Sequence, residues 1–269
     1  MGRKRLAAIL AVSLLAACGN AEPTATPGGP DRVLLQYVSE GGFVPVDWVL
    51  RLSPLFTLTT DGLLISQGFT DLRYPGPLVP PFVATRLTDG ELRQIFTLIE
   101  RMGLPGITEE HDESGSDLIA DAPTEKLTYW DSNGTHEYSA YAPGMGTGTP
   151  TSKTAALVEI RTVLEQLTFN GEQVEYEPAR ARIIIGDGEF FDPEFAEERD
   201  WPLDETDISG WADLAGMWKC KAFPAEVLSR FTEAHQAMVW KSPNPSEDTL
   251  YTFVVRALLP GEPDCPSLD

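Results

Sequence analysis

The 269-residue chain has few of the residues on which common catalytic sites depend. It contains three histidines and three cysteines. There is no G-x-S-x-G or S-x-x-K motif, so the nucleophile motifs of the usual serine hydrolases and penicillin-recognising enzymes are missing. There is also no H-E-x-x-H zincin motif and no C-x-x-C redox pair. These absences favour a protein that is not an enzyme and holds no cofactor.

Basic residues are also scarce. The chain has 20 Lys and Arg against 41 Asp and Glu, a formal net charge of −21. Such a surface repels phosphate backbones and anionic headgroups. Nucleic acid is therefore not an expected partner.

No apolar run is long enough to cross a bilayer, but a short one lies at the start of the chain. Arg3, Lys4 and Arg5 precede an apolar stretch over residues 6–15, which is typical of an export signal. The stretch Leu15-Ala16-Ala17-Cys18 then resembles the lipobox of bacterial lipoproteins. That resemblance implies a signal peptide over residues 1–17 and a diacylated cysteine at the mature N-terminus. The alternative is an ordinary small-residue cleavage site beside a cysteine.

The lipobox implies a location at the membrane. Two or more acyl chains bind a bilayer firmly, so the protein is expected on the extracytoplasmic face of the cell membrane, with the lipid on Cys18 as its membrane contact. Residues 18–30 include "GNAEPTATPGGP" and read as a flexible tether. Without residues 1–17 the chain has 17 basic and 41 acidic residues, a formal charge of −24.

Cys220 and Cys265 are the remaining cysteines. In an oxidising compartment an even pair predicts a disulfide. Two reduced, buried thiols are the alternative.

The fold class indicated by the patterns is α+β, with antiparallel hairpins and packed helices. Residues 54–68 contain an alternating run, the turn dipeptide Asp61-Gly62 and a second apolar run, which predicts a hairpin. Thr88 and Glu91 then have the spacing of a capping box before a helix that ends near Gly103. The same order recurs in a hairpin around Asn133-Gly134 and a helix over residues 149–169. Residues 31–170 are thus predicted to form two ββα units.

The C-terminal portion, residues 171–269, is less regular and is predicted as a smaller αβ part. A strand is expected over residues 179–188 and a final strand over residues 250–260, just before Cys265. A helix is expected over residues 223–238, with Pro224 in its first turn and Val227, Leu228, Phe231 and Met238 facing inward.

Four segments resemble motifs of a group of uncharacterised exported proteins from actinobacteria and related bacteria. They are "EGGFVPVDWVLRLSPLFTLTTDGLLI", "YPGP", "DAPTEKLTY" and "RALLPGEPDC". The resemblance spans most of the mature chain and implies export, but it implies no activity.

Two loops have the composition of a ligand site. Residues 142–154, "APGMGTGTPTSKT", are glycine-rich and precede a predicted helix, but their spacing matches neither a dinucleotide fingerprint nor a P-loop. Residues 109–123 are rich in acidic side chains, among which Asp112, Asp117 and Asp121 are weak candidates for calcium ligands. The EF-hand order is not met, and a solvated acidic loop is the alternative.

A third segment combines aromatic and acidic residues. Residues 186–207, "GDGEFFDPEFAEERDWPLDETD", include Phe190, Phe191 and Trp201, which could contact a ligand or partner. Packing of these rings against the core is the alternative, and paired carboxylates for hydrolysis are another. His136, in a strand, and His235, on the polar edge of the last helix, are expected to be structural or solvated.

These patterns lead to one expectation about function. We expect a lipid-anchored extracytoplasmic module that binds a protein or a small molecule, or that is structural. An extracytoplasmic hydrolase with paired carboxylates, or a calcium-binding surface protein, is the alternative.

Overall fold

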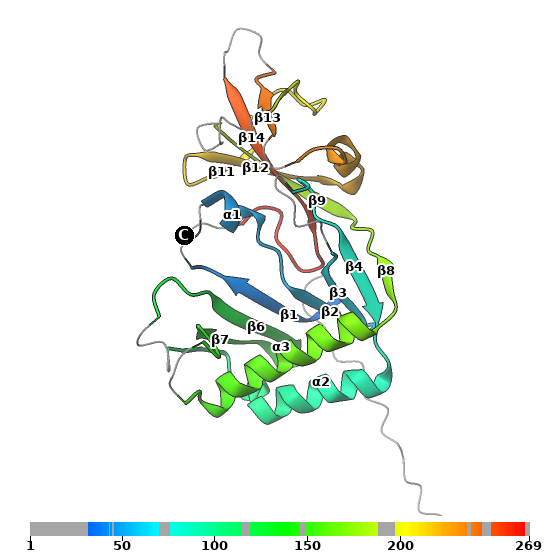
Figure 1. Ribbon diagram of the computed structural model, residues 1–269, viewed down its shortest axis with the longest axis vertical. Coiled ribbons are helices and arrows are strands. Elements are labelled where there is room, and N and C mark those ends of the chain that lie inside the picture. The colour runs from blue at the N-terminus through cyan, green and yellow to red at the C-terminus, as the bar shows by residue number, and fades with distance from the viewer. Residues whose placement is uncertain are drawn as a thin grey trace, which may run out of the picture.

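The computed structural model describes residues 32–42, 44, 46–69, 76–113, 119–145, 149–187, 197–235, 238–243 and 249–266. Cys18, Asp117, Phe190 and Phe191 lie outside these ranges. The described residues form an α+β fold with two mostly antiparallel sheets, one of eight strands and one of six (Figure 1). No described helix is long and apolar enough to cross a membrane.

The eight-stranded sheet has the order β5-β7-β6-β1-β2-β3-β4-β8. Both predicted hairpins are present, and the first strand of the chain lies between them and pairs antiparallel with each. The sheet also contains strands that the two predicted ββα units did not include, and its edge strand β8 extends it beyond residue 170. The strands are β1 (Val33–Glu40), β2 (Phe56–Thr59), β3 (Leu63–Gln67), β4 (Phe82–Arg86), β5 (Glu109–Asp112), β6 (Thr124–Asp131), β7 (Gly134–Tyr141) and β8 (Gln173–Glu175).

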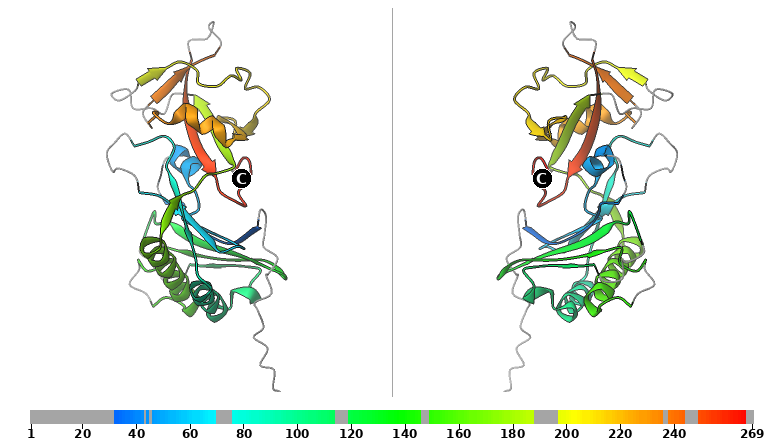
Figure 2. Two further views of the ribbon diagram at one scale, coloured as in Figure 1. Left: turned by 90° about the vertical axis from the view of Figure 1, so that its right-hand side faces the viewer. Right: turned by 90° about the vertical axis from the view of Figure 1, so that its left-hand side faces the viewer.

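Two helices cover one face of this sheet, on the side away from the second sheet (Figure 2). The first, α2 (Asp89–Met102), has the predicted capping box between Thr88 and Glu91 and ends at Gly103 in the left-handed conformation. The second is α3 (Ser152–Asn170), capped by Thr151. Their apolar faces, including Ile95, Ile99, Ile160 and Leu164, pack on the sheet in the largest core cluster of the described residues.

A buried charged group lies inside this core. Glu125 on β6 is 2% exposed and accepts hydrogen bonds from the hydroxyl of Tyr37 and the guanidinium of Arg161 on α3. Burial raises the pKa of Tyr37, and the neighbouring charge of Glu125 raises it further. Both partners thus satisfy a carboxylate that would otherwise be costly to bury.

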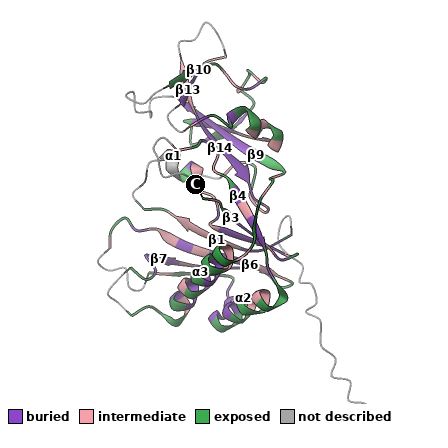
Figure 3. Ribbon diagram, turned by 45° about the vertical axis from the view of Figure 1, so that its right-hand side comes forward, coloured by how far each residue is buried: buried purple, intermediate pink, exposed green. Residues whose placement is uncertain are grey.

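The six-stranded sheet has the order β10-β13-β14-β9-β12-β11. Its central strands β9 and β14 correspond to the two strands predicted in the C-terminal part. Buried residues run along β14 and its neighbours, because both faces of the sheet are covered (Figure 3). The strands are β9 (Arg180–Asp187), β10 (Glu197–Arg199), β11 (Ala212–Leu214), β12 (Trp218–Pro224), β13 (Met238–Lys241) and β14 (Leu250–Leu258).

The helix predicted over residues 223–238 is wrong. Strand β12 continues to Pro224, a short 3-10 helix, η4 (Ala225–Phe231), follows, and β13 begins at Met238. His235 lies after the helix in an isolated bridge with Pro77, not on a helical face. Phe231 and Met238 are nevertheless buried. These two side chains face inward as expected, but their spacing fits a 3-10 turn followed by a strand as well as it fits a helix.

Segments from the N-terminal half join the two sheets. The short helix α1 (Val46–Arg51) packs against β14, and Leu50 lies in a buried cluster with Ile184 and Val254. On the same side, residues 259–266 turn back after β14, and we call this segment the C-terminal loop. The second sheet therefore meets the face of the first sheet that α2 and α3 leave open (Figure 2).

Candidate functional site: a pocket where the two sheets meet

A pocket of about 270 Å³ lies at this junction. Strand β1 supplies one wall, α1 and the turn after it supply a second, and the C-terminal loop supplies a third, with two arginines of the second sheet at its base. These elements are far apart in the sequence. We call this cavity the junction pocket.

The two arginines come from the central strands of the second sheet. Arg182 on β9 and Arg256 on β14 are directly paired across the strands, so both side chains lie on the same face. Each residue is only 3% exposed. Cys220, which pairs with Ile184 of β9, lies on this face as well. Two guanidinium groups are thus held side by side under α1 and the C-terminal loop.

Arg256 has a buried carboxylate as its partner. Its guanidinium donates to Glu262 in the C-terminal loop and, through Nη1, to the carbonyl oxygen of Leu52 and to Ser53 Oγ at 2.6 Å. Glu262 also accepts a 2.8 Å hydrogen bond from the backbone N–H of Leu259. The Nε of Arg256 is buried and has no acceptor among the described residues. An unsatisfied buried donor of this kind costs about 1–3 kcal/mol, and more when it is charged.

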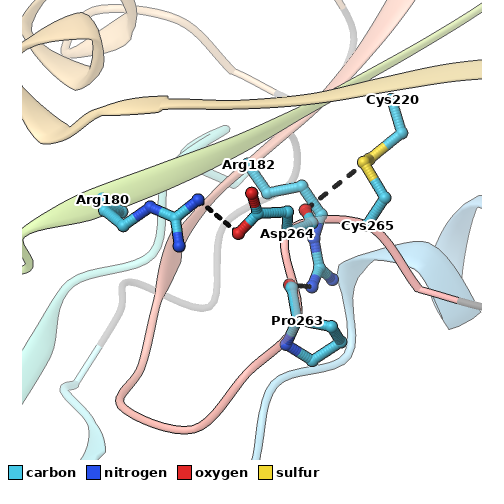
Figure 4. The surroundings of a disulfide bond; sticks show 6 residues. All are labelled: Arg180, Arg182, Cys220, Pro263, Asp264 and Cys265. Atoms are coloured by element: carbon cyan, nitrogen blue, oxygen red, sulfur yellow. Dashed lines mark hydrogen bonds and ion pairs between the residues drawn. A yellow bond between two sulfur atoms is a disulfide. The ribbon is translucent and has the colours of Figure 1, made fainter. Parts of the chain in front are cut away.

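Arg182 has no carboxylate partner among the described residues. Its Nε donates to the carbonyl oxygen of Asp264 at 2.9 Å and its Nη2 donates to that of Pro263, as Figure 4 shows. The Asp264 carboxylate instead pairs with Arg180 at the surface. The positive charge of Arg182 is therefore met by carbonyl dipoles and not by an ion.

The ionisation of Arg182 reflects this arrangement. Burial lowers the pKa of Arg182 to about 10, and the neighbouring charge of Arg256 acts in the same direction. Glu262 and Asp264 oppose the shift but do not cancel it. At neutral pH the side chain still carries its charge.

The predicted disulfide closes this part of the site. Cys220 on β12 is bonded to Cys265 in the C-terminal loop, which is anchored to the sheet next to Arg182 (Figure 4). The Sγ of Cys220 lies 3.7 Å from the carbonyl oxygen of Asp264. Because a disulfide sulfur carries no proton, this is a close contact and not a hydrogen bond. The prediction that the two cysteines pair is confirmed.

The chain matches no family model, no curated protein and no solved structure.

The acidic stretch is partly a strand and does not form a cation site among the described residues. Asp112 ends β5 and accepts hydrogen bonds from the hydroxyls of Tyr138, Thr151 and Thr154 at 2.5–3.0 Å. Asp121 has a positive φ of 61° in the following loop. Within the described ranges, no group of three or more His, Cys, Asp or Glu side chains could hold a metal ion.

The same contacts bear on the glycine-rich loop. Thr151 is the N-cap of α3, and the Asp112 carboxylate already lies at this helix end. A helix N-terminus favours an anion, and here a side chain of the chain itself supplies one. The part of this loop over residues 146–148 lies outside the described residues.

Of the three aromatic residues named in residues 186–207, Trp201 is the one that the structure describes, and it packs against the buried cluster of the six-stranded sheet. Its ring contacts Tyr251 and Phe253 edge-on, with centroids 5.8 and 5.3 Å apart, and its Nε1 donates to the carbonyl oxygen of Glu205 at 2.8 Å. Trp201 is therefore packed against the core, which was the alternative to contact with a ligand or partner.

A larger surface pocket, of about 450 Å³, lies beside η4. Two of its three carboxylates, Asp204 and Glu205, are paired with Arg230 and Lys221, respectively. Hydrogen bonds from these partners lower the pKa of both carboxyl groups. A glycosidase needs a general acid whose pKa is raised, so these two side chains do not supply that acid.

His136 is held inside the first sheet between two acceptors. Its Nδ1 lies 2.8 Å from the carbonyl oxygen of Ile107 and its Nε2 lies 3.0 Å from Asp131 Oδ1. Desolvation lowers the pKa of His136, but the hydrogen bonds to Asp131 and Ile107 raise it more, and the net shift is upward. Of the two roles expected for His136, the structure shows the structural one.

Sequence reasoning missed the two arginines at the base of the junction pocket. A signal was present, because each interrupts an apolar strand, in "ARIIIG" and "FVVRALL". A charged residue in a continuous apolar strand is unusual unless it has a buried partner or a function.

Proposed function

We propose that this protein is a lipid-anchored extracytoplasmic binding protein and that it holds a small molecule in the junction pocket. Cys18 in the lipobox-like stretch would carry the anchor, and residues 18–30 would separate the folded body from the membrane. The Cys220–Cys265 disulfide supports an oxidising compartment.

The observation that carries the proposal is the charge at the base of the pocket. Burying a guanidinium without a counter-ion is costly, and Arg182, which lines the junction pocket, is buried with no ion pair to any described residue. Clefts between structural units, with mainly apolar walls and a few convergent polar groups, are the usual places for small ligands. Asp204 and Glu205 beside η4 are paired with basic side chains at the surface, so the geometry favours binding over hydrolysis by these two carboxylates.

The anchor and the binding site can be tested separately. Mass spectrometry of the protein isolated from membranes should find a diacylated Cys18 as its first residue. Binding is tested by a thermal-shift screen of the purified protein with anionic, neutral and cationic small molecules. Hits should lose their effect in Val38→Trp, in which an indole fills the β1 wall of the pocket.

A mature protein that begins at another residue would overturn the anchor. The binding function would be overturned if no class of compound stabilised the protein, or if every hit acted equally on Val38→Trp.

A further inference from the structure

We propose that the ligand of the junction pocket is a small organic monoanion, a carboxylate with a short apolar tail. This inference rests on the proposed binding function and names the chemical class that the pocket selects. It follows from the balance of charge, the free donors and the walls of the cavity.

The balance of charge points to a single negative charge. Two buried guanidiniums, Arg182 and Arg256, face one buried carboxylate, Glu262. The other acidic side chain of the lining, Glu40, lies 3.3 Å from Lys126 and is neutralised there. One positive charge thus remains among the described residues of the pocket. A carboxylate would cancel it, whereas a phosphate dianion would leave a negative charge in excess.

The free hydrogen-bond donors also fit a carboxylate. Within the described residues, Nε and Nη2 of Arg182 are used by carbonyl groups and its Nη1 has no acceptor. Nε of Arg256 has none either, but this atom is fully enclosed and does not face the cavity. A carboxylate has two oxygens, each with two lone pairs, and forms its strongest hydrogen bonds with guanidinium groups. Nη1 of Arg182 is therefore the donor that remains for an acceptor from outside the chain.

The walls determine the rest of the molecule. Val38, Leu50, Leu52, Pro54 and Pro266 give the pocket an apolar lining above the arginines. Its volume of about 270 Å³ lies just below the range of about 300–1,000 Å³ that is usual for small-molecule sites. A short aliphatic or similarly small apolar tail would fill it.

The positive charge of the two arginines in the pocket contrasts with the negative net charge of the chain. A protein of net charge −21 has little general affinity for anions. If the pocket binds an anion, the binding is therefore due to the two buried arginines and not to the electrostatic field of the whole surface.

The test is isothermal titration of the full mature protein with three probes of similar shape: hexanoate, hexanamide and hexyl phosphate. We expect hexanoate to bind at least about tenfold more tightly than hexanamide, since a charged hydrogen-bond partner is lost in the amide. Hexyl phosphate should bind more weakly than hexanoate at a pH where it is a dianion.

Three variants test whether the preference for hexanoate arises in the junction pocket. Arg182→Gln should abolish the preference for hexanoate over hexanamide, and Val38→Trp should abolish binding of both. Arg180→Gln is the matched control, because Arg180 lies on the same strand but pairs with Asp264 outside the pocket lining. Arg180→Gln should keep the preference. Because Arg182 also holds the C-terminal loop, the comparison of hexanoate with hexanamide on the unmodified protein stands even if Arg182→Gln fails to fold.

The outcomes separate the two proposals. Equal or tighter binding of hexanamide, lost in Val38→Trp, would overturn the carboxylate assignment and leave the binding function intact. Tighter binding of hexyl phosphate would overturn the monoanion assignment. No binding by any probe, together with no hit in the thermal-shift screen, would overturn both.

Discussion

The disulfide gives the most quantitative prediction for stability. Cys220 and Cys265 are separated by 45 positions and close the loop that contains η4, β13 and β14. In the chain-entropy model, closing a loop of this length lowers the entropy of the unfolded chain enough to stabilise the fold by about 4 kcal/mol at 25 °C. Replacing both residues by alanine, Cys220→Ala with Cys265→Ala, should remove this contribution.

The assay is urea unfolding of a lipid-free form that carries Cys18→Ser, so that detergent is not needed. With an m-value of about 3 kcal/mol/M, the midpoint should fall by more than about 1 M. Cys220 is 1% exposed, so the alanine variant also loses some packing. Reduced protein with both cysteines in place separates the two effects, because it loses only the bond. A midpoint in reduced protein equal to that of the oxidised form would refute the reasoning.

Three further predictions concern other parts of the chain. His136 should titrate with a pKa above its ordinary value of about 6.5, as measured from the pH dependence of its imidazole proton resonances in NMR spectra. Its pairing with Asp131 then stabilises the fold fully below about pH 6.5, and this contribution is lost as the pH rises through the folded-state pKa. Gly186→Ala should lower the free energy of unfolding by about 1–3 kcal/mol, measured by urea unfolding, since an added Cβ would lie 2.4 Å from the Trp218 ring. Cys18→Ser should move the protein from the membrane fraction to the soluble fraction, as shown by immunoblotting.

Each of these has its own contradicting result. A midpoint at or below pH 6.5 for His136 would mean that the Asp131 contact does not outweigh burial. Gly210→Ala is the matched control for Gly186→Ala, because its Cβ would meet no atom within 4 Å; equal destabilisation by both changes would show that the Trp218 contact is not the cause. Retention of Cys18→Ser at the membrane would remove the lipid as the anchor.

The local elements were predictable because their signals are local. Asp61-Gly62 and Asn133-Gly134 mark the two tight turns, and the capping box of Thr88 and Glu91 fixes the start of α2. Each of these signals is read within a few residues of the chain. The structure therefore agrees with the sequence at both hairpins and both long helices.

The parts that were missed depend on contacts between distant residues. Strand β1 lies between the two hairpins, and no local pattern specifies this pairing. The register that places Arg182 opposite Arg256 joins residues 74 positions apart, and it decides whether their charges share one pocket. The helix predicted over residues 223–238 failed for a related reason, since pairing of Met238 and its neighbours in β13 overrides their helical spacing.

The most direct test of ligand binding in the junction pocket is a crystal structure of the protein grown with saturating hexanoate. We expect density for the ligand in the junction pocket, with its carboxylate within hydrogen-bond distance of Arg182 and its tail against Val38 and Leu50. A pocket that holds only ordered water, with hexanoate bound elsewhere or not at all, would contradict the assignment of this ligand.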